Sequence, residues 1–170
     1  MSDFELVQAR LESASRECRL HLDRLNHARR KLADRFPLSV EDWQQLDDDT
    51  IADLDQLLFR FGRLQDTIGQ RVFRHLLELP LEWEDSEPFI DKLSRLERLG
   101  VIPSAEQWVT LRELRNSAMY EYPDQPELTV ANLNRIHEAA EPLEKIFHAA
   151  DRFASTLQSG TTCLRPRLQM

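Results

Sequence analysis

The stretch DDDTIADLDQLLFRFGRLQDTIGQRVFRHLLEL, residues 47–79, decides the fold of this 170-residue chain. Its apolar residues recur at spacings of three and four, which places their side chains on one face of an α-helix. This apolar stripe consists of Ile51, Leu54, Leu57, Leu58, Phe61, Leu64, Ile68, Val72, Leu76 and Leu79. Three aspartates precede the stripe, where the helix dipole favours negative charge, and Pro80 ends it. The stretch therefore predicts one long helix with an apolar face to bury.

The rest of the chain shows the same periodicity on both sides of this helix. Further helices are predicted over residues 4–36, in a short turn from a Ser39 cap with Asp42 through Trp43, and over residues 87–99, 104–121 and 129–157. Short connections make sequential helices antiparallel. The predicted fold is therefore all-α: an antiparallel up-and-down helical bundle of four main helices plus short helices. Residues 1–158 are assigned to this single domain, and residues 159–170 to a flexible C-terminal tail.

Two glycines and one proline inside the predicted helices indicate how those helices pack and bend. Gly62 and Gly69 lie seven residues apart on one helix face, and we expect them to let a neighbouring helix approach. Pro142 lies inside the last predicted helix. Because proline lacks a backbone N–H and its ring clashes with the preceding turn, we expect it to kink that helix.

The composition favours a cytoplasmic globular protein and excludes several kinds of site. Hydrophobic residues make up 41% of the chain, and no run approaches the ~18 consecutive apolar residues of a membrane span. Cys18 and Cys163 are too few for a disulfide framework or a thiolate metal site, so a reducing compartment and no metal are expected. The net charge of −8 excludes a surface that binds nucleic acid along its whole length. Any RNA contact must therefore be local.

Arg115 interrupts an apolar helix stripe and needs an explanation. The stripe consists of Trp108, Leu111, Ala118, Met119 and Tyr122. A buried charge persists only when it is paired, so one interpretation is an ion pair with a carboxylate from another helix. The other interpretation is an anion site, because the guanidinium group is a rigid fork of donors that suits a phosphate group. The sequence leaves both open.

The segment Arg115-Asn116-Ser117-Ala118-Met119-Tyr120-Glu121-Tyr122 resembles the active-site motif of HEPN-family ribonuclease toxins. That motif has arginine, a polar residue, three further residues, histidine, one residue and tyrosine. Asn116 supplies the polar residue, and Tyr120 stands where the family has histidine. Residues 60–66, Arg-Phe-Gly-Arg-Leu-Gln-Asp, also resemble the arginine-phenylalanine segment of the second helix in HepT-type toxins. The order of helices agrees with that family over most of the chain.

This resemblance implies the toxin component of a HEPN/nucleotidyltransferase toxin–antitoxin system. Such a toxin is a metal-independent endoribonuclease without a cofactor, a homodimer whose motif helices meet in a cleft, and its antitoxin is a minimal nucleotidyltransferase. The resemblance assigns the catalytic positions to Arg115, Asn116 and Tyr120. It implies that Tyr122 accepts adenylate groups from the antitoxin, and phosphates added beside Arg115 would repel RNA. Without the motif, the simpler interpretation of Tyr122 is a helix-end aromatic that packs beside Pro123.

Tyr120 falls at the position that matters most for activity. A phenol with an ordinary pKa near ~10 is a poor proton shuttle at neutral pH. In the implied reaction the RNA 2′-hydroxyl attacks the adjacent phosphate, arginine offsets the developing charge, and histidine moves protons. Loss of a general acid or base typically lowers the rate by about 10²- to 10⁴-fold. We therefore expect this chain to be a weak or silent enzyme in which Arg115 and Asn116 still bind phosphate.

Two other functions stay open at this stage. The first is a non-catalytic helical binding subunit that docks a nucleotidyltransferase or another partner. The second is a helical adaptor in which Arg115 only makes a buried ion pair. The five histidines show no carboxylate or cysteine at ligand spacing and are interpreted as surface or packing residues. Among them His75, near Arg71 and Arg74, is the candidate for a substitute acid in the cleft.

Overall fold

The computed structural model describes residues 2–118 and 124–163, with side chains up to Ser159. Every regular element in these two ranges is helical, which confirms the predicted all-α bundle. The elements are α1 (Asp3–Lys31), α2 (Val40–Gln44), α3 (Asp48–Thr67), η1 (Ile68–Val72), α4 (Phe73–Glu78), α5 (Phe89–Arg98), α6 (Ala105–Ser117) and α7 (Pro126–Cys163).

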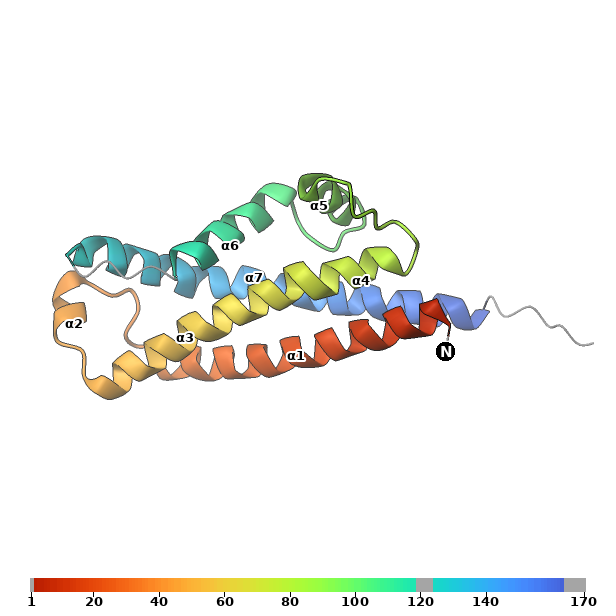
Figure 1. Ribbon diagram of the computed structural model, residues 1–170. Helices are drawn as coiled ribbons and strands as arrows, with labels where there is room; N and C mark the ends of the chain where they lie inside the picture. The colour runs from red at the N-terminus through yellow and green to blue at the C-terminus, as the bar shows by residue number, and fades with distance from the viewer. Residues whose placement is uncertain (1, 119–123, 164–170) are drawn as a thin grey trace, which may run out of the picture.

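A central rod made of α3, η1 and α4 organises the bundle (Figure 1). Helix α1 lies along one side of this rod, and α6 with α5 lies along the other. Helix α7 packs behind and contacts α1, α3, α4 and α6, while α2 closes one end of the bundle against α7. The rod thus has neighbours on three sides and keeps its fourth side open to solvent.

Local capping bonds explain where the helices start. The Ser39 hydroxyl accepts the backbone N–H of Asp42 at 3.0 Å, and the Asp42 carboxylate accepts the Ser39 N–H in return at 3.1 Å. Ser104 caps α6 in the same way through a 3.0 Å bond from the Gln107 N–H. Each cap satisfies a backbone donor that the helix itself leaves unpaired. The starts predicted at Ser39 and Ser104 are confirmed.

The core is built largely from the apolar stripe that the sequence identified. Buried members of that stripe are Leu54, Leu57, Phe61, Leu64, Ile68, Val72, Leu76 and Leu79, whereas Ile51 is exposed. They pack with Trp108 of α6 and Phe147 of α7, which are also buried. Each fully buried side chain of this size stabilises the fold by about 1.5–3 kcal/mol relative to exposure.

The predicted helix over residues 47–79 contains a π-helical turn that the sequence did not indicate. Backbone angles stay helical through Ile68, so α3, η1 and α4 remain one continuous rod. A π-turn widens the helix by one residue and rotates everything after it relative to an uninterrupted α-helix. Arg71 lies within this turn and pairs with Glu17 of α1, a contact described below.

The ends of three helices differ from the prediction. Helix α1 ends at Lys31 rather than near Phe36, and α6 ends at Ser117 rather than near residue 121. Helix α7 begins at Pro126, continues through Pro142 and reaches Cys163, so it starts before and ends after the predicted range of 129–157. Ser, Gly and Thr are poor helix formers, but extending an existing helix is far easier than starting one. Residues 164–170 lie outside the described part of the chain.

Candidate functional site

A groove of about 460 Å³ lies between the central rod and helices α5 and α6. Its lining combines cations, aromatic rings and amides: Gln65, Asp66, Gly69, Gln70, Arg74, Trp83, Phe89, Trp108, Arg112, Arg115 and Asn116. The residues of the 60–66 segment and of the motif helix, far apart in sequence, therefore meet in one place. We call this feature the arginine–aromatic groove.

Of the two glycines expected to let a neighbouring helix approach, Gly69 meets that expectation and Gly62 does not. A β-carbon at Gly69 would lie 3.0 Å from Cζ2 of Trp108, which is tighter than an ordinary contact, so the ring packs directly on the backbone. A β-carbon at Gly62 would lie 3.8 Å from Cγ of Arg115, an ordinary van der Waals distance. Only Gly69 is therefore sterically required, and it holds Trp108 in the wall of the groove.

Arg115 forms an ion pair across the groove wall. Its Nη2 donates to Oδ2 of Asp66 at 2.5 Å, and its Nη1 lies 3.4 Å from Oδ1 of Asn116. The Arg115 and Asp66 side chains are 27% and 20% exposed, so the pair is partly screened by water. The interpretation of Arg115 as paired with a carboxylate from another helix is thereby confirmed. Arg115 also keeps its place in the groove lining, where solvent reaches it.

Arg112 is the cation of the groove that has no carboxylate partner in the described part of the chain. It is exposed, and its guanidinium carbon lies 5.7 Å from the centre of the Phe89 ring. Arg74 differs, because its Nε donates to Glu78 at 2.7 Å while its guanidinium lies 5.2 Å from the Trp83 ring. Arg112 is therefore the group most available to an incoming anion.

Charged groups contact both the indole N–H and the ring face of Trp83. Its indole Nε1 donates to Asp85 at 2.8 Å, and Nζ of the buried Lys92 lies 3.8 Å from the ring centre. Trp108 is deeper, packed on Phe73 with ring centres 4.6 Å apart. The groove thus offers aromatic surface beside a guanidinium fork. That combination suits a ligand with a flat ring and a phosphate group.

The described groove lining holds no histidine, and the candidate for a substitute acid does not reach it. His75 is 8% exposed, and its Nδ1 lies 2.7 Å from Oε2 of Glu78 on its own helix. His75 is therefore a packing residue, in agreement with the interpretation of the histidines as surface or packing residues, and the alternative role as a substitute acid in this groove is not supported. Tyr120 and Tyr122 belong to residues 119–123, which lie outside the described residues. The site geometry therefore includes only the first half of the motif, residues 115–118.

A second polar cluster joins α1 to the rod and was missed from the sequence. Glu17 accepts Thr67 Oγ1 at 3.3 Å and Arg63 Nη2 at 3.4 Å, and it also pairs with Arg71. His21 lies one helical turn further, with Nε2 at 3.4 Å from Glu17. The interpretation of the histidines as lacking carboxylate partners is thus wrong here. The i, i+4 spacing of Glu17 and His21 was the signal that could have identified the pair.

The partners of His21 fix its protonation state. Arg60 Nη1 lies 2.9 Å from Nδ1, and because guanidinium only donates, Nδ1 must accept and the proton of the neutral ring sits on Nε2. Burial, followed by the charge of Arg60, lowers the pKa of His21. Burial acts to raise the pKa of Glu17, but the His21 hydrogen bond and the Arg71 charge outweigh it, so that pKa is lowered. Both ring nitrogens are engaged, so this pair holds α1 against the rod rather than transferring protons.

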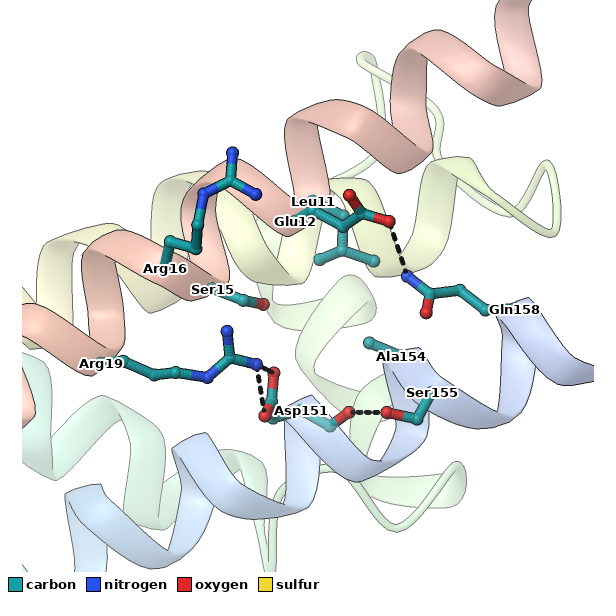
Figure 2. Close-up of a pocket in the computed structure, with 9 residues that line it drawn as sticks. All are labelled: Leu11, Glu12, Ser15, Arg16, Arg19, Asp151, Ala154, Ser155 and Gln158. Atoms are coloured by element: carbon teal, nitrogen blue, oxygen red, sulfur yellow. Dashed lines mark hydrogen bonds and ion pairs between the residues drawn. The ribbon is translucent and has the colours of Figure 1, made fainter.

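A smaller groove of about 300 Å³ separates α1 from α7 (Figure 2). Nη2 of Arg19 donates to both carboxylate oxygens of Asp151, at 2.8 and 2.9 Å, and Gln158 Nε2 donates to Glu12 at 3.4 Å. Arg16 also lines this groove, and no aromatic ring does. The Arg19–Asp151 and Gln158–Glu12 contacts join the two long helices, and the groove lacks the rings of the arginine–aromatic groove.

Cys18 does not offer an alternative nucleophile. It is fully buried in the core, and burial, followed by the charge of Glu17, raises the pKa of its thiol to about 12. A thiol at that pKa stays protonated at neutral pH, whereas the thiolate is the reactive form.

Comparison of the chain with protein-family models, curated proteins and solved structures finds no match. Within residues 2–118 and 124–163, no helix is both long and apolar enough to cross a bilayer. In the same residues, no group of three or more His, Cys, Asp or Glu side chains is arranged to hold a metal ion.

Proposed function

We propose that the arginine–aromatic groove binds RNA and that the protein is a HEPN-type, HepT-like toxin component in which this groove is the substrate site. The observation that carries the proposal is the meeting of Arg112 and Arg115 with Trp83 and Phe89 in one groove. A guanidinium fork recognises a phosphate group, and an aromatic ring stacks on an unpaired base. These are the two contacts that a local RNA site needs on a protein of net charge −8.

Asp66 determines how Arg115 takes part. The carboxylate accepts one N–H of Arg115 and repels a phosphate placed beside it. Arg112 has no such competitor among the described residues, so it makes the first contact with the phosphate. Arg115 and Asn116 then supply further donors from the next turn of α6. In this arrangement Asp66 orients Arg115 and keeps a partly buried cation paired when RNA is absent.

The chemistry proposed for the histidine-bearing form is transfer of the phosphate to the 2′-hydroxyl of the same RNA strand. The 2′-oxygen gains the bond to phosphorus as it loses its proton, the 5′-oxygen leaves and takes a proton, and Arg115 offsets the charge that develops on the phosphate. Tyr120 replaces the group that would move these protons. The present chain is therefore proposed to bind RNA and to cleave it poorly or not at all.

Restoring the histidine tests this proposal. Tyr120→His is expected to cut RNA about 10²- to 10⁴-fold faster than the unmodified chain, without added metal. Tyr120→His combined with Arg115→Ala is the control, and it is expected to lose that gain. Growth arrest on expression of Tyr120→His without a partner would accompany cleavage. An inert Tyr120→His variant that folds normally would rule out the enzyme.

The same proposal includes a cytoplasmic homodimer and a minimal nucleotidyltransferase as antitoxin, with Tyr122 as the residue that accepts adenylate. Tyr120 itself favours a second candidate, a non-catalytic subunit that docks the nucleotidyltransferase. Recovery of a stable complex with the product of a neighbouring reading frame, with no RNA cleavage by either the unmodified chain or Tyr120→His, would select this second candidate.

The Arg115–Asp66 pair favours a third candidate, the helical adaptor. An adaptor needs neither RNA nor a dimer, so it predicts a monomer in sedimentation and no saturable binding of short RNA. The toxin predicts a complex with RNA, and the docking subunit predicts a complex with the nucleotidyltransferase. The adaptor predicts neither of these complexes.

A further inference from the structure

Four arginines lie where the rod faces α1, and two of them pair with the carboxylate of Glu17. Arg60, Arg63 and Arg71 lie on the rod and Arg24 on α1, and Glu17 is the carboxylate to which Arg63 and Arg71 donate. We call these four arginines the α1–α3 arginine surface. They concentrate positive charge locally on a protein whose net charge is −8.

The surroundings of Arg60 disfavour its positive charge. Burial, followed by the charges of Arg24 and Arg63, lowers the pKa of Arg60, and its Nε is buried without a hydrogen-bond partner. The Arg63 and Arg71 side chains remain 50% and 40% exposed. Like charges held together at an accessible surface are stabilised by an anion from outside the chain.

The solvent side of the rod connects this surface to the arginine–aromatic groove. Phe59, Arg63, Gln70 and Arg74 are all exposed along it, and Arg74 also lines the groove. At 1.5 Å of rise per residue, Arg63 and Arg74 lie about 16 Å apart along the helix axis. Figure 1 shows this side of the rod open between α1 and α6. The length corresponds to a few nucleotides of a single strand.

Phe59 indicates which kind of polyanion fits. Its side chain is 55% exposed, and the guanidinium carbon of Arg60 lies 5.1 Å from the ring centre. An exposed ring beside arginines is a stacking platform for an unpaired base, and the bases of a duplex are already stacked on one another.

We propose that the α1–α3 arginine surface holds the phosphate backbone of a single-stranded RNA whose next nucleotides occupy the arginine–aromatic groove. Arg24 and Arg63 contact phosphates, and Phe59 stacks on a base at the end of this surface that lies away from the groove. This inference rests on the proposed function, because it extends the same RNA beyond the groove.

The test compares a fluorescein-labelled oligouridylate 3-mer, long enough for the groove alone, with a 12-mer, by fluorescence anisotropy over a range of salt concentrations. The variant is Arg24→Gln with Arg63→Gln. Its control, matched in charge, is Arg30→Gln with Arg135→Gln, two exposed arginines for which the described part of the chain shows no ion pair. Circular dichroism checks that both doubles keep the helical content of the unmodified protein.

The unmodified protein is expected to bind the 12-mer at least about tenfold more tightly than the 3-mer. The Arg24/Arg63 double should lose most of that gain and lower the slope of log affinity against log salt by about 1.4, or 0.7 for each phosphate that an arginine no longer neutralises. Its affinity for the 3-mer should not change, and the control should behave as the unmodified protein. Phe59→Ala should weaken the 12-mer without changing the salt slope, and a 12-base-pair duplex should compete poorly.

Failure of the inference and failure of the proposed function give different results. If the 3-mer binds and Arg112→Gln abolishes its binding, while the Arg24/Arg63 double equals its control on the 12-mer, the α1–α3 arginine surface is not an RNA contact and the groove function stands. If the 3-mer shows no saturable binding, the groove function fails, and with it the inference that one strand joins the two sites. Equal binding of duplex and single strand would overturn the single-strand assignment.

Discussion

Gly62 and Gly69 provide a matched pair of substitutions that tests how α6 is held against the rod. Both are replaced by alanine. In a helix interior alanine is more stable than glycine by about 0.8–1.0 kcal/mol, so each variant begins with the same expected gain. At Gly62 the new methyl group would lie 3.8 Å from Cγ of Arg115 and meets only an ordinary contact. Gly62→Ala is therefore expected to raise the free energy of unfolding by about 0.5–1 kcal/mol.

At Gly69 the methyl group would lie 3.0 Å from Cζ2 of Trp108. Trp108 is 1% exposed and packs on Phe73, so the ring has no space into which to move. Overpacking of a filled core typically costs about 1–3 kcal/mol, which outweighs the gain in helix propensity. Gly69→Ala should thus be less stable than Gly62→Ala by about 1–3 kcal/mol.

Urea unfolding followed by far-ultraviolet circular dichroism measures both free energies, and near-ultraviolet circular dichroism reports displacement of Trp108. Each 1 kcal/mol corresponds to about 2–4 °C in Tm for a chain of this size, so thermal unfolding offers a second readout. If Gly69→Ala proved as stable as Gly62→Ala, the close approach of Trp108 to the rod would be refuted.

Three further predictions concern a strained turn, a buried histidine and the groove carboxylate. Leu81→Gly is expected to raise the free energy of unfolding by up to about 1 kcal/mol in urea, because an L-residue at positive φ costs about 1–2 kcal/mol; Leu81 has φ 59° and is 91% exposed. The pKa of His21 is lowered by burial, so its contribution to stability is complete above pH ~6.5 and is lost as pH falls from there through the folded-state pKa. His21→Gln, whose amide can still accept from Arg60 and donate to Glu17, should flatten the stability–pH profile in that window, and a profile identical to that of the unmodified protein would contradict this. Asp66→Asn should tighten binding of a short RNA by about fivefold, the effect of removing about 1 kcal/mol of repulsion at ~4 Å in water, and weaker binding would exclude Asp66 as a competitor.

The parts of the fold that follow from neighbouring residues were predictable. Capping requires only residues three apart, so the helix starts at Ser39 and Ser104 were visible in the sequence. Helical periodicity likewise identified the buried face of the rod, including Phe61 and Ile68. The π-turn was not predictable, because nothing local distinguishes Ile68–Val72 from an α-helical segment with the same apolar spacing.

The candidate site was only half predictable for the same reason. The misplaced charge of Arg115 was evident within its own helix, but its partner Asp66 lies 49 residues away and is brought close only by packing of α6 on α3. Trp83 and Phe89 enter the groove because of how the segment before α5 and α5 itself lie over the rod, and no short-range spacing encodes that position. The Glu17–His21 pair was encoded at i, i+4 spacing and was missed through interpretation rather than lack of signal.

The most direct test of the RNA-binding groove uses its own tryptophan. Trp83 and Trp108 line the groove and Trp43 does not, so Trp43→Phe leaves intrinsic fluorescence that reports on the groove. Titration of this variant with a short single-stranded RNA is expected to quench the emission saturably, because a base stacked on Trp83 quenches it, and Arg112→Gln should abolish the response. Saturable RNA binding with unchanged emission, or no binding at low salt, would contradict the central claim that RNA occupies this groove.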